Sequence, residues 1–290
     1  MDRKKAIVTG ASRGIGAGIA ENLAKNGYDL AISYSHKYDC GDTYAKQTME
    51  ALQEKYGCAC HLFDADFKVK GAAEEFIHSA ITALNGVDLL VNNGMKPELG
   101  GSILDIDPDD IEGMANSYIR STFLMMRQTA RCMVMHRIPG SIVNITSGRA
   151  ERALPGGGLY GGLKACLTHA SRSFALDLAP YGIRINCIAP GYIKVRTYEE
   201  YLNEGRTKKQ ADDMIRLEKM VPIGYPGSAD DIGKAVAWIA SDDAAYVTGT
   251  VLTVDGGFFL PGMPEETPNE GEEYRGWVCF KDRSSETWDI

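Results

Sequence analysis

The feature that most constrains the fold of this chain is a regular alternation of short apolar runs with helix-length segments, from residue 4 to about residue 254. The runs are mostly apolar and rich in Val and Ile, as expected for strands buried on both faces of a sheet. A helix between consecutive strands lets them pair in parallel. The alternation therefore predicts an α/β fold, a single doubly wound domain with a central seven-stranded parallel sheet flanked by helices. The expected strands are residues 6–8, 30–33, 59–63, 89–91, 141–145, 183–188 and 251–254, and the expected helices are 16–26, 43–56, 72–84, 109–136, 160–179 and 229–240.

Two regions interrupt this alternation. Residues 192–222 form a charge-rich insertion after the sixth expected strand, with helical stretches expected at 198–204 and 208–219. Residues 261–290 form an acidic extension, in which eight Asp and Glu against three Lys and Arg give −5 of the chain's net −8. Its apolar segment 277–280 would be costly to leave in water. We expect this extension to pack near the insertion of its own or a neighbouring subunit, the alternative being a disordered tail that aids solubility.

Composition and charge exclude several classes of protein. The net charge of −8 disfavours nucleic acid and anionic membranes as partners. No apolar run reaches the ~18 residues of a membrane helix, and the apolar stretch at residues 6–8 is too short for a signal peptide. We therefore expect a cytoplasmic protein. The seven cysteines are scattered without a C-x-x-C pair, which favours reduced cysteines over disulfides and predicts no metal site.

A glycine-rich turn follows the first expected strand and precedes the first helix. Glycines in such a turn permit a tight bend, close approach of the backbone to a phosphate, and close packing of helix on strand. The start of the helix then offers free N–H groups to a pyrophosphate. The turn predicts a dinucleotide site formed by Gly10, Ser12, Arg13, Gly14, Ile15 and Gly16.

The end of the second expected strand indicates which dinucleotide binds. An acidic residue there would bind the ribose 2′-hydroxyl of NAD and repel the 2′-phosphate of NADP. The sequence instead continues with Ser35, His36 and Lys37, and Arg13 in the turn adds a guanidinium suited to phosphate. We therefore expect NADP(H), with NAD(H) less favoured, unless His36 and Lys37 are simply solvated loop residues.

A second set of chemical groups surrounds the start of the helix at 160–179. Tyr160 and Lys164 lie one turn apart on the same helix face, and Ser147 lies thirteen residues before Tyr160 at the end of a strand. A neighbouring ammonium should lower the phenol's pKa from its usual value of ~10 and make Tyr160 a general acid or base. Ser147 could hydrogen-bond the same carbonyl oxygen of a substrate as Tyr160.

Together these motifs resemble the classical short-chain dehydrogenase/reductase family over about residues 4–260. The matching motifs are Thr9–Gly16 (T-G-x-x-x-G-x-G), Asp64, Asn92-Asn93, Ser147…Tyr160-x-x-x-Lys164, Pro190-Gly191 and Val254-Asp255-Gly256-Gly257. The resemblance implies a Rossmann-type catalytic domain at 1–260, with 192–222 as a substrate-loop insertion and 261–290 as an added extension.

The resemblance also implies roles for individual residues. Tyr160 would protonate a ketone oxygen or take the proton of an alcohol, Lys164 would lower the pKa of Tyr160 and hold the nicotinamide ribose, and Ser147 would orient the substrate oxygen. For the cofactor, the resemblance implies that Asp64 contacts the adenine, Asn93 the adenosine-side ribose, and Ile193 the nicotinamide amide. The cofactor itself supplies the hydride chemistry.

Two positions depart from the family pattern. Met95 stands where a glycine normally lies beside the cofactor. The family's helix Asn, which helps to relay protons to the active-site Lys, aligns with Tyr118, whereas Asn116 lies two residues earlier on a different helix face. Either Tyr118 or a main-chain carbonyl with water serves the relay, or the helix is locally offset.

The substrate is expected to be a small molecule that carries an alcohol, ketone or aldehyde, because the family hosts many carbonyl substrates. Charged residues near the expected pocket suit a polar or anionic compound such as a sugar or sugar acid, unless they are solvated or paired with one another. These residues are Lys96, Glu98, Arg149, Glu151, Arg152, Lys194 and Arg196. Met95, Leu154, Tyr192 and Met220 could instead line an apolar wall for a steroid-sized ligand.

Other functions remain open at this level. A 3-oxoacyl-[acyl-carrier-protein] reductase or a hydroxysteroid dehydrogenase are enzymatic alternatives, although the negative charge does not favour an acidic carrier. A catalytically idle sensor or scaffold that binds NADP(H) is an alternative of another class. The resemblance also implies a homo-oligomer, a dimer or homotetramer, packed through the long helices at 109–136 and 160–179.

Overall fold

The computed structural model describes residues 3–37, 42–94, 101–203, 205 and 207–260, together with the backbone of 273–274 and 277–278. Seven strands form one parallel sheet in the order β3-β2-β1-β4-β5-β6-β7, so the chain reverses direction across the sheet between β1 and β4. Ligands bind at this type of switch point in doubly wound sheets. The strands are β1 (Lys4–Val8), β2 (Tyr28–Tyr34), β3 (Cys60–Asp64), β4 (Leu89–Asn92), β5 (Ser141–Ile145), β6 (Arg184–Pro190) and β7 (Val251–Val254).

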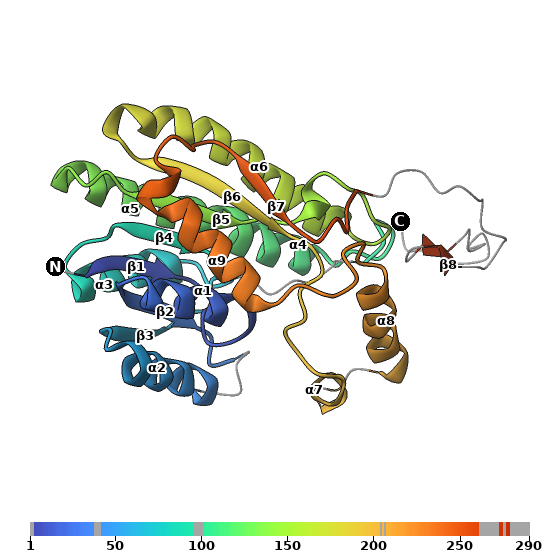
Figure 1. Ribbon diagram of the computed structural model, residues 1–290. Coiled ribbons are helices and arrows are strands. Elements are labelled where there is room, and N and C mark those ends of the chain that lie inside the picture. The colour runs from blue at the N-terminus through green and yellow to red at the C-terminus, as the bar shows by residue number, and fades with distance from the viewer. Residues whose placement is uncertain are drawn as a thin grey trace.

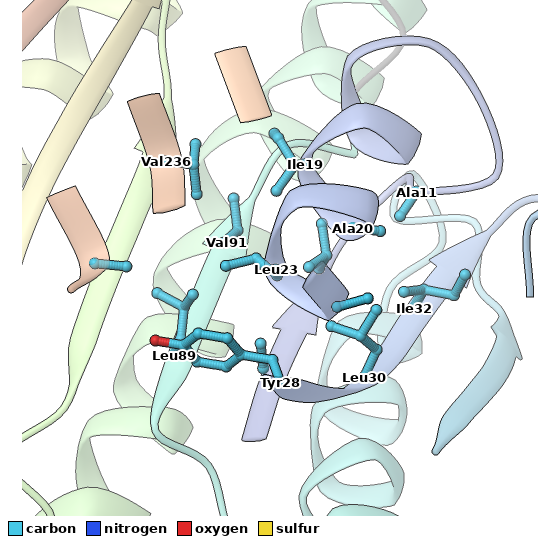
Figure 2. Packing of buried hydrophobic residues seen from close by; sticks show 14 of the residues in the cluster. Ala11, Ile19, Ala20, Leu23, Tyr28, Leu30, Ile32, Leu89, Val91 and Val236 are labelled. Atoms are coloured by element: carbon cyan, nitrogen blue, oxygen red, sulfur yellow. The ribbon is translucent and has the colours of Figure 1, made fainter. Parts of the chain in front are cut away.

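Helices cover both faces of the sheet (Figure 1). The bounds are α1 (Gly14–Lys25), α2 (Thr43–Tyr56), α3 (Ala72–Leu84), α4 (Pro108–Ala115), α5 (Thr122–His136), α6 (Gly158–Leu178), α7 (Tyr198–Asn203), α8 (Lys208–Lys219) and α9 (Ala229–Ala240). Alternate residues of β1 face opposite cores: Ala6 and Val8 pack with α1 and α9, whereas Ile7 packs with α3 and α5. Figure 2 shows the first of these cores, where Ile19 and Leu23 of α1 meet Val236 of α9 over strands β1, β2 and β4.

The expected strands and most expected helices are confirmed to within a few residues. The exception is the helix at 109–136, which the structure divides into α4, a π-helical turn at Asn116–Ser121, and α5. A π turn accommodates an extra residue and rotates the side chains that follow. The local offset that the sequence left open therefore exists, and it lies beside Tyr118.

The insertion forms two short helices, α7 and α8, which lie together away from the sheet layers (Figure 1). A capping box starts α8, because Thr207 accepts from the Gln210 N–H and the Gln210 side chain accepts from the Thr207 N–H. Beyond residue 260 only two short antiparallel strands are described, β8 (Glu273–Tyr274) and β9 (Trp277–Val278). The expected packing of the extension against the insertion lies outside the described residues.

Within the described ranges, no helix has the length and hydrophobicity needed to cross a membrane. Five of the seven cysteines fall in these ranges, and each of them is a free thiol: Cys58, Cys60, Cys132, Cys166 and Cys187.

Candidate active site

The turn between β1 and α1 depends on glycine at two kinds of position. Gly10 and Gly14 have φ values of 61° and 58°, in the left-handed region that other L-residues rarely adopt. A Cβ on Gly16 would lie 2.0 Å from the carbonyl oxygen of Gly10, so no side chain fits there. No side chain caps the start of α1, which leaves its first N–H groups directed at the space beyond the turn.

Neighbouring strands hold this turn in place. The side-chain amide of Asn93 donates to the carbonyls of Thr9 and Gly10, each at 3.0 Å, and the Asn93 N–H donates to the Thr9 hydroxyl at 2.8 Å. The Ser33 hydroxyl accepts from the Gly10 N–H at 3.0 Å. Asn93 thus uses both amide hydrogens to brace the turn, and only its oxygen remains for a ligand. The bracing roles of Thr9 and Ser33 were missed from the sequence: Thr9 was recognised only as the first residue of the glycine motif, and Ser33 belongs to no motif.

A cleft of about 400 Å³ lies at the ends of β2 and β3, lined among others by Ser35, His36, Lys37 and Asp64. The Asp64 carboxylate accepts from the His36 N–H at 2.9 Å and so joins the two strand ends. The His36 ring lies 2.9 Å from Asp42, and the Lys37 ammonium lies 4.0 Å from Asp66. The structure therefore brings the expected adenosine-side residues together in one cleft.

The structure also brings together Ser147, Tyr160 and Lys164. Ser147 follows β5 and accepts from the Arg149 N–H at 3.2 Å, which starts a one-turn 3₁₀ helix at Gly148–Ala150. Tyr160 lies in the first turn of α6, and Lys164 lies one turn later with only 4% of its surface exposed. The Lys164 ammonium donates to the carbonyl of Ile145 at 2.7 Å.

The charge balance at Tyr160 differs from the sequence-based expectation. Burial raises the pKa of Tyr160 above its usual 10, while the Ser147 hydroxyl and the positive charge of Arg149 oppose this rise. Burial also lowers the pKa of Lys164 to about 7. The net shift of the Tyr160 pKa is therefore upward, because burial outweighs the groups that oppose it. Lys164 is itself buried and its ammonium is directed at Ile145, and Arg149 is the cation that opposes the rise.

Tyr118 occupies the place next to this pair. Only 1% of its surface is exposed, and its ring meets that of Tyr160 edge-to-face, with centroids 5.9 Å apart. The Lys164 ammonium lies 5.1 Å from the centroid of the Tyr118 ring. The side chain of Asn116 is directed away from Lys164, since its amide donates to the carbonyl of Lys68 at 2.6 Å. The π turn contains both residues, and it places Tyr118, not Asn116, beside Lys164.

The remaining sequence landmarks are placed as follows. Ile193 follows β6 and forms an isolated parallel bridge with Gly227. Asp255, after β7, accepts from the Gly257 and Phe259 N–H groups, each at 2.9 Å. A cavity of about 240 Å³ reaches Ser147 from the side of β7, but Tyr160 and Lys164 do not line it. Met95, Lys96 and Glu98 lie outside the described residues.

The described charges near the site fall into two groups. Lys194 pairs with Glu218 at 2.9 Å, Arg152 donates to the carbonyl of Leu260 at 3.0 Å, and Arg196 lies 5.8 Å from the centroid of the Tyr201 ring. Arg149 differs from these three, since it is half-buried beside Tyr160. The sequence grouped it with the rim charges, although its position two residues after Ser147 is the signal that could have singled it out.

Comparisons with known proteins agree with this geometry. A family profile described as "Enoyl-(Acyl carrier protein) reductase" matches residues 10–259. The chain is 31% identical to 3beta-hydroxysteroid dehydrogenase 1 of Eggerthella lenta, over 90% of this chain and 95% of that protein. It is 30% identical to glucose 1-dehydrogenase 2 of Bacillus subtilis, over 89% and 95% of the two chains.

A solved structure extends the comparison to three dimensions. The short chain dehydrogenase from Burkholderia cenocepacia J2315, in complex with NADP, superposes with a TM-score of 0.75 at 31% identity, over 88% of this chain and 97% of that one. The fold, the order of motifs and these relatives lead to one assignment. The chain belongs to the classical short-chain dehydrogenase/reductase family and is an oxidoreductase that acts on alcohol or keto groups with a nicotinamide cofactor.

Proposed function

We propose that this protein interconverts a secondary alcohol and a ketone or aldehyde with NADP(H) as cofactor, on a polar hydroxy or keto compound. The observation that carries the proposal is the meeting of Ser147, Tyr160 and Lys164 at the carboxyl edge of the sheet, on the same edge as the glycine turn. A proton donor and a dinucleotide site on one edge are what carbonyl reduction requires.

The residues of the turn fit a dinucleotide. The open start of α1 and the absence of side chains at Gly10, Gly14 and Gly16 suit a pyrophosphate. Ser12, Arg13 and Ile15 would line the path of the pyrophosphate. Asp64 would contact the adenine, Asn93 the adenosine-side ribose, and Ile193 the nicotinamide amide. When bound, the cofactor supplies the hydride in reduction and accepts it in oxidation.

The preference for NADP(H) rests on the end of β2. Ser35, His36 and Lys37 line the cleft there with no acidic residue at the strand end itself. Arg13 lies 5.4 Å from the centroid of the Tyr44 ring, at the border between the turn and α2. A 2′-phosphate would be held by these cationic and hydroxyl groups.

The chain's own residues would move the proton as follows. Ser147 and Tyr160 would both hydrogen-bond the substrate oxygen, and in reduction Tyr160 would donate its proton to that oxygen. Lys164, whose pKa of about 7 lies near neutrality, would carry the positive charge that favours the resulting phenolate. Tyr118 would hold Lys164 against Tyr160, because an aromatic face stabilises an ammonium above it.

A single pair of variants tests this mechanism. Tyr160→Phe should lower turnover by about 10²–10⁴-fold while leaving cofactor affinity nearly unchanged, since only the ionisable hydroxyl is lost. Tyr181→Phe, an exposed tyrosine beyond the far end of α6, is the matched control. Turnover is followed by NADPH oxidation with a panel of sugars, keto acids, β-ketoacyl thioesters and 3-ketosteroids.

The panel also separates the alternatives. Activity on β-ketoacyl thioesters alone would favour a 3-oxoacyl-[acyl-carrier-protein] reductase, and activity on ketosteroids alone would favour a hydroxysteroid dehydrogenase. Binding of NADPH without turnover of any compound would favour the idle sensor. Near-normal turnover by Tyr160→Phe would contradict the assignment of Tyr160.

We further propose that the protein forms a homodimer or homotetramer. The long helices α5 and α6 come after the neighbouring strands β4 and β5 and pack on the same face of the sheet, and α6 has 21 residues. Leu176 on α6 and Met135 on α5 are both exposed. Molar mass by light scattering decides between a monomer and these assemblies.

A further inference from the structure

Arg149 is placed against the reacting groups by its backbone. It follows Ser147 by two residues, and its N–H donates to the Ser147 hydroxyl at 3.2 Å. A Cβ on Gly161, the residue after Tyr160, would lie 2.8 Å from the carbonyl oxygen of Arg149. The main chain of Arg149 therefore packs directly on the first turn of α6, and its side chain starts from a point between Ser147 and Tyr160.

The guanidinium lies at the start of α6. A Cβ on Gly157, the residue that precedes this helix, would lie 3.9 Å from Nη1 of Arg149. The first turn of α6 contains no acidic residue. Along the described part of the chain, no carboxylate acts on Arg149, and the ionisable group that does is the phenol of Tyr160.

This arrangement is unfavourable for the protein alone. Burial works against the charged form of a guanidinium and lowers the pKa of Arg149, and among the described residues no carboxylate offsets that cost. Lys194 and Arg152, by contrast, have a carboxylate and a carbonyl as partners. A half-buried arginine beside a proton-transfer site, without an acidic partner in the part of the chain that the structure describes, is the pattern expected where an anionic ligand supplies the opposite charge.

We propose that Arg149 binds an anionic group of the substrate, so that the substrate is a hydroxy or keto compound that carries a carboxylate or phosphate close to the reacting carbon. This inference rests on the proposed function, because it takes Tyr160 as the group that binds the reacting oxygen. The planar guanidinium presents parallel N–H donors that match the two oxygens of either anion. Arg149 would thereby orient the carbonyl toward Ser147 and Tyr160.

Arg149 could instead act only on Tyr160, by lowering the pKa of its phenol. The two roles predict different kinetics. Loss of a substrate contact raises KM for anionic substrates and leaves neutral ones nearly unchanged. Loss of an effect on Tyr160 lowers kcat for all substrates alike and shifts the basic limb of the pH profile to higher pH.

The test compares pairs of related substrates of which only one member carries an anionic group. The acids are 2-oxobutanoate, acetoacetate and levulinate, each paired with its methyl ester, and dihydroxyacetone phosphate is paired with dihydroxyacetone. The variants are Arg149→Met, which keeps most of the length of the side chain without its charge, and Arg149→Lys, which keeps the charge without the parallel N–H donors of the guanidinium. Arg131→Met, at an exposed position of α5, is the control. Thermal unfolding shows that each variant is folded.

We expect the unmutated protein to prefer at least one anion over its neutral partner, and Arg149→Met to lower kcat/KM for that anion by about ten- to a hundredfold, mainly through KM. Arg149→Lys should recover part of this loss, and Arg131→Met should leave the ratio unchanged. Which anion is preferred distinguishes a carboxylate from a phosphate. Equal use of the acids, the phosphate and their neutral partners would overturn the proposal, as would an equal loss on both members of a pair in Arg149→Met.

A binding measurement separates this inference from the proposed function. Calorimetric titration of levulinate and of dihydroxyacetone phosphate into the protein saturated with NADP+ needs no turnover. Binding of either anion that Arg149→Met abolishes supports the anion site even where no compound is reduced. Turnover of neutral ketones without any Arg149-dependent binding of anions would leave the oxidoreductase function in place and exclude the anion site.

Discussion

The turn between β1 and α1 and the start of α6 lie on the same edge of the sheet, yet they are constructed from different parts of the chain. The turn is formed by backbone: glycines with positive φ, an uncapped helix start, and main-chain carbonyls that accept from Asn93. The start of α6 instead carries ionisable side chains, a buried Lys164 and a partly buried Tyr160, whose properties depend on what surrounds them. Substitutions in the first region should therefore act through geometry, and those in the second through charge.

The largest effect on stability is expected at Lys164. Its pKa is about 7 in the folded protein and returns to its ordinary 10.5 on unfolding. Between these pH values the unfolded chain binds more protons, so the stability of the folded state increases as the pH rises from about 7 to about 10.5. Below that window the buried ammonium destabilises the fold. Lys164→Met should abolish turnover and yet raise the free energy of unfolding at pH 6 by about 2–4 kcal/mol.

Urea unfolding of both proteins at several pH values measures this effect. The gain from Lys164→Met should shrink as the pH approaches 10, because the unmutated lysine is then neutral in the fold at little cost. Lys55→Met serves as the control, since Lys55 lies on the surface in an ion pair with Glu21. A gain in the free energy of unfolding that does not depend on pH would show that burial does not lower the pKa of Lys164.

A smaller effect, on cofactor affinity, is expected at Arg13. This residue is the charged side chain in a turn that is otherwise formed by backbone groups. Arg13→Ala removes one charge-assisted contact to a 2′-phosphate, worth roughly 1.5–3 kcal/mol, or about ten- to a hundredfold in affinity. NADPH binding should weaken by this factor, and NADH binding to the same variant should hardly change. Fluorescence titration of both cofactors measures it. Equal affinity of the unmutated protein for NADPH and NADH would refute the preference for NADP(H).

The smallest effect is expected from adding one carbon to the turn. Gly16→Ala places a Cβ where the Gly10 oxygen lies, and such overpacking typically costs about 1–3 kcal/mol of stability. Gly162→Ala is the matched control: it lies in the interior of α6 with no atom within 4 Å of the added Cβ, and should raise stability by about 0.5–1 kcal/mol. Thermal unfolding compares the two. Equal behaviour of both variants would mean that the turn tolerates a side chain.

Local patterns in the sequence were enough to predict most of the fold. The apolar strands predict a parallel sheet because each strand reports its own burial, and the strand at 141–145 was predicted with the bounds that the structure shows. The glycine turn could likewise be recognised, since its geometry depends on residues within one loop. The order Ser147, Tyr160 and Lys164 sufficed to predict that the three residues meet.

Only the tertiary structure decided how these residues are charged and which neighbours they have. The π turn brings Tyr118 to Lys164 and directs Asn116 to the carbonyl of Lys68, which the helical period of the sequence alone does not indicate. Whether Lys164 is buried, and whether Arg149 meets a carboxylate as Lys194 does, depends on segments distant in the chain. The sequence thus determined the sheet, the turn and which residues are the candidates for the reaction. The fold determined their pKa values and pairing, because burial and electrostatic interaction are set by contacts between distant segments and not by neighbours along the chain.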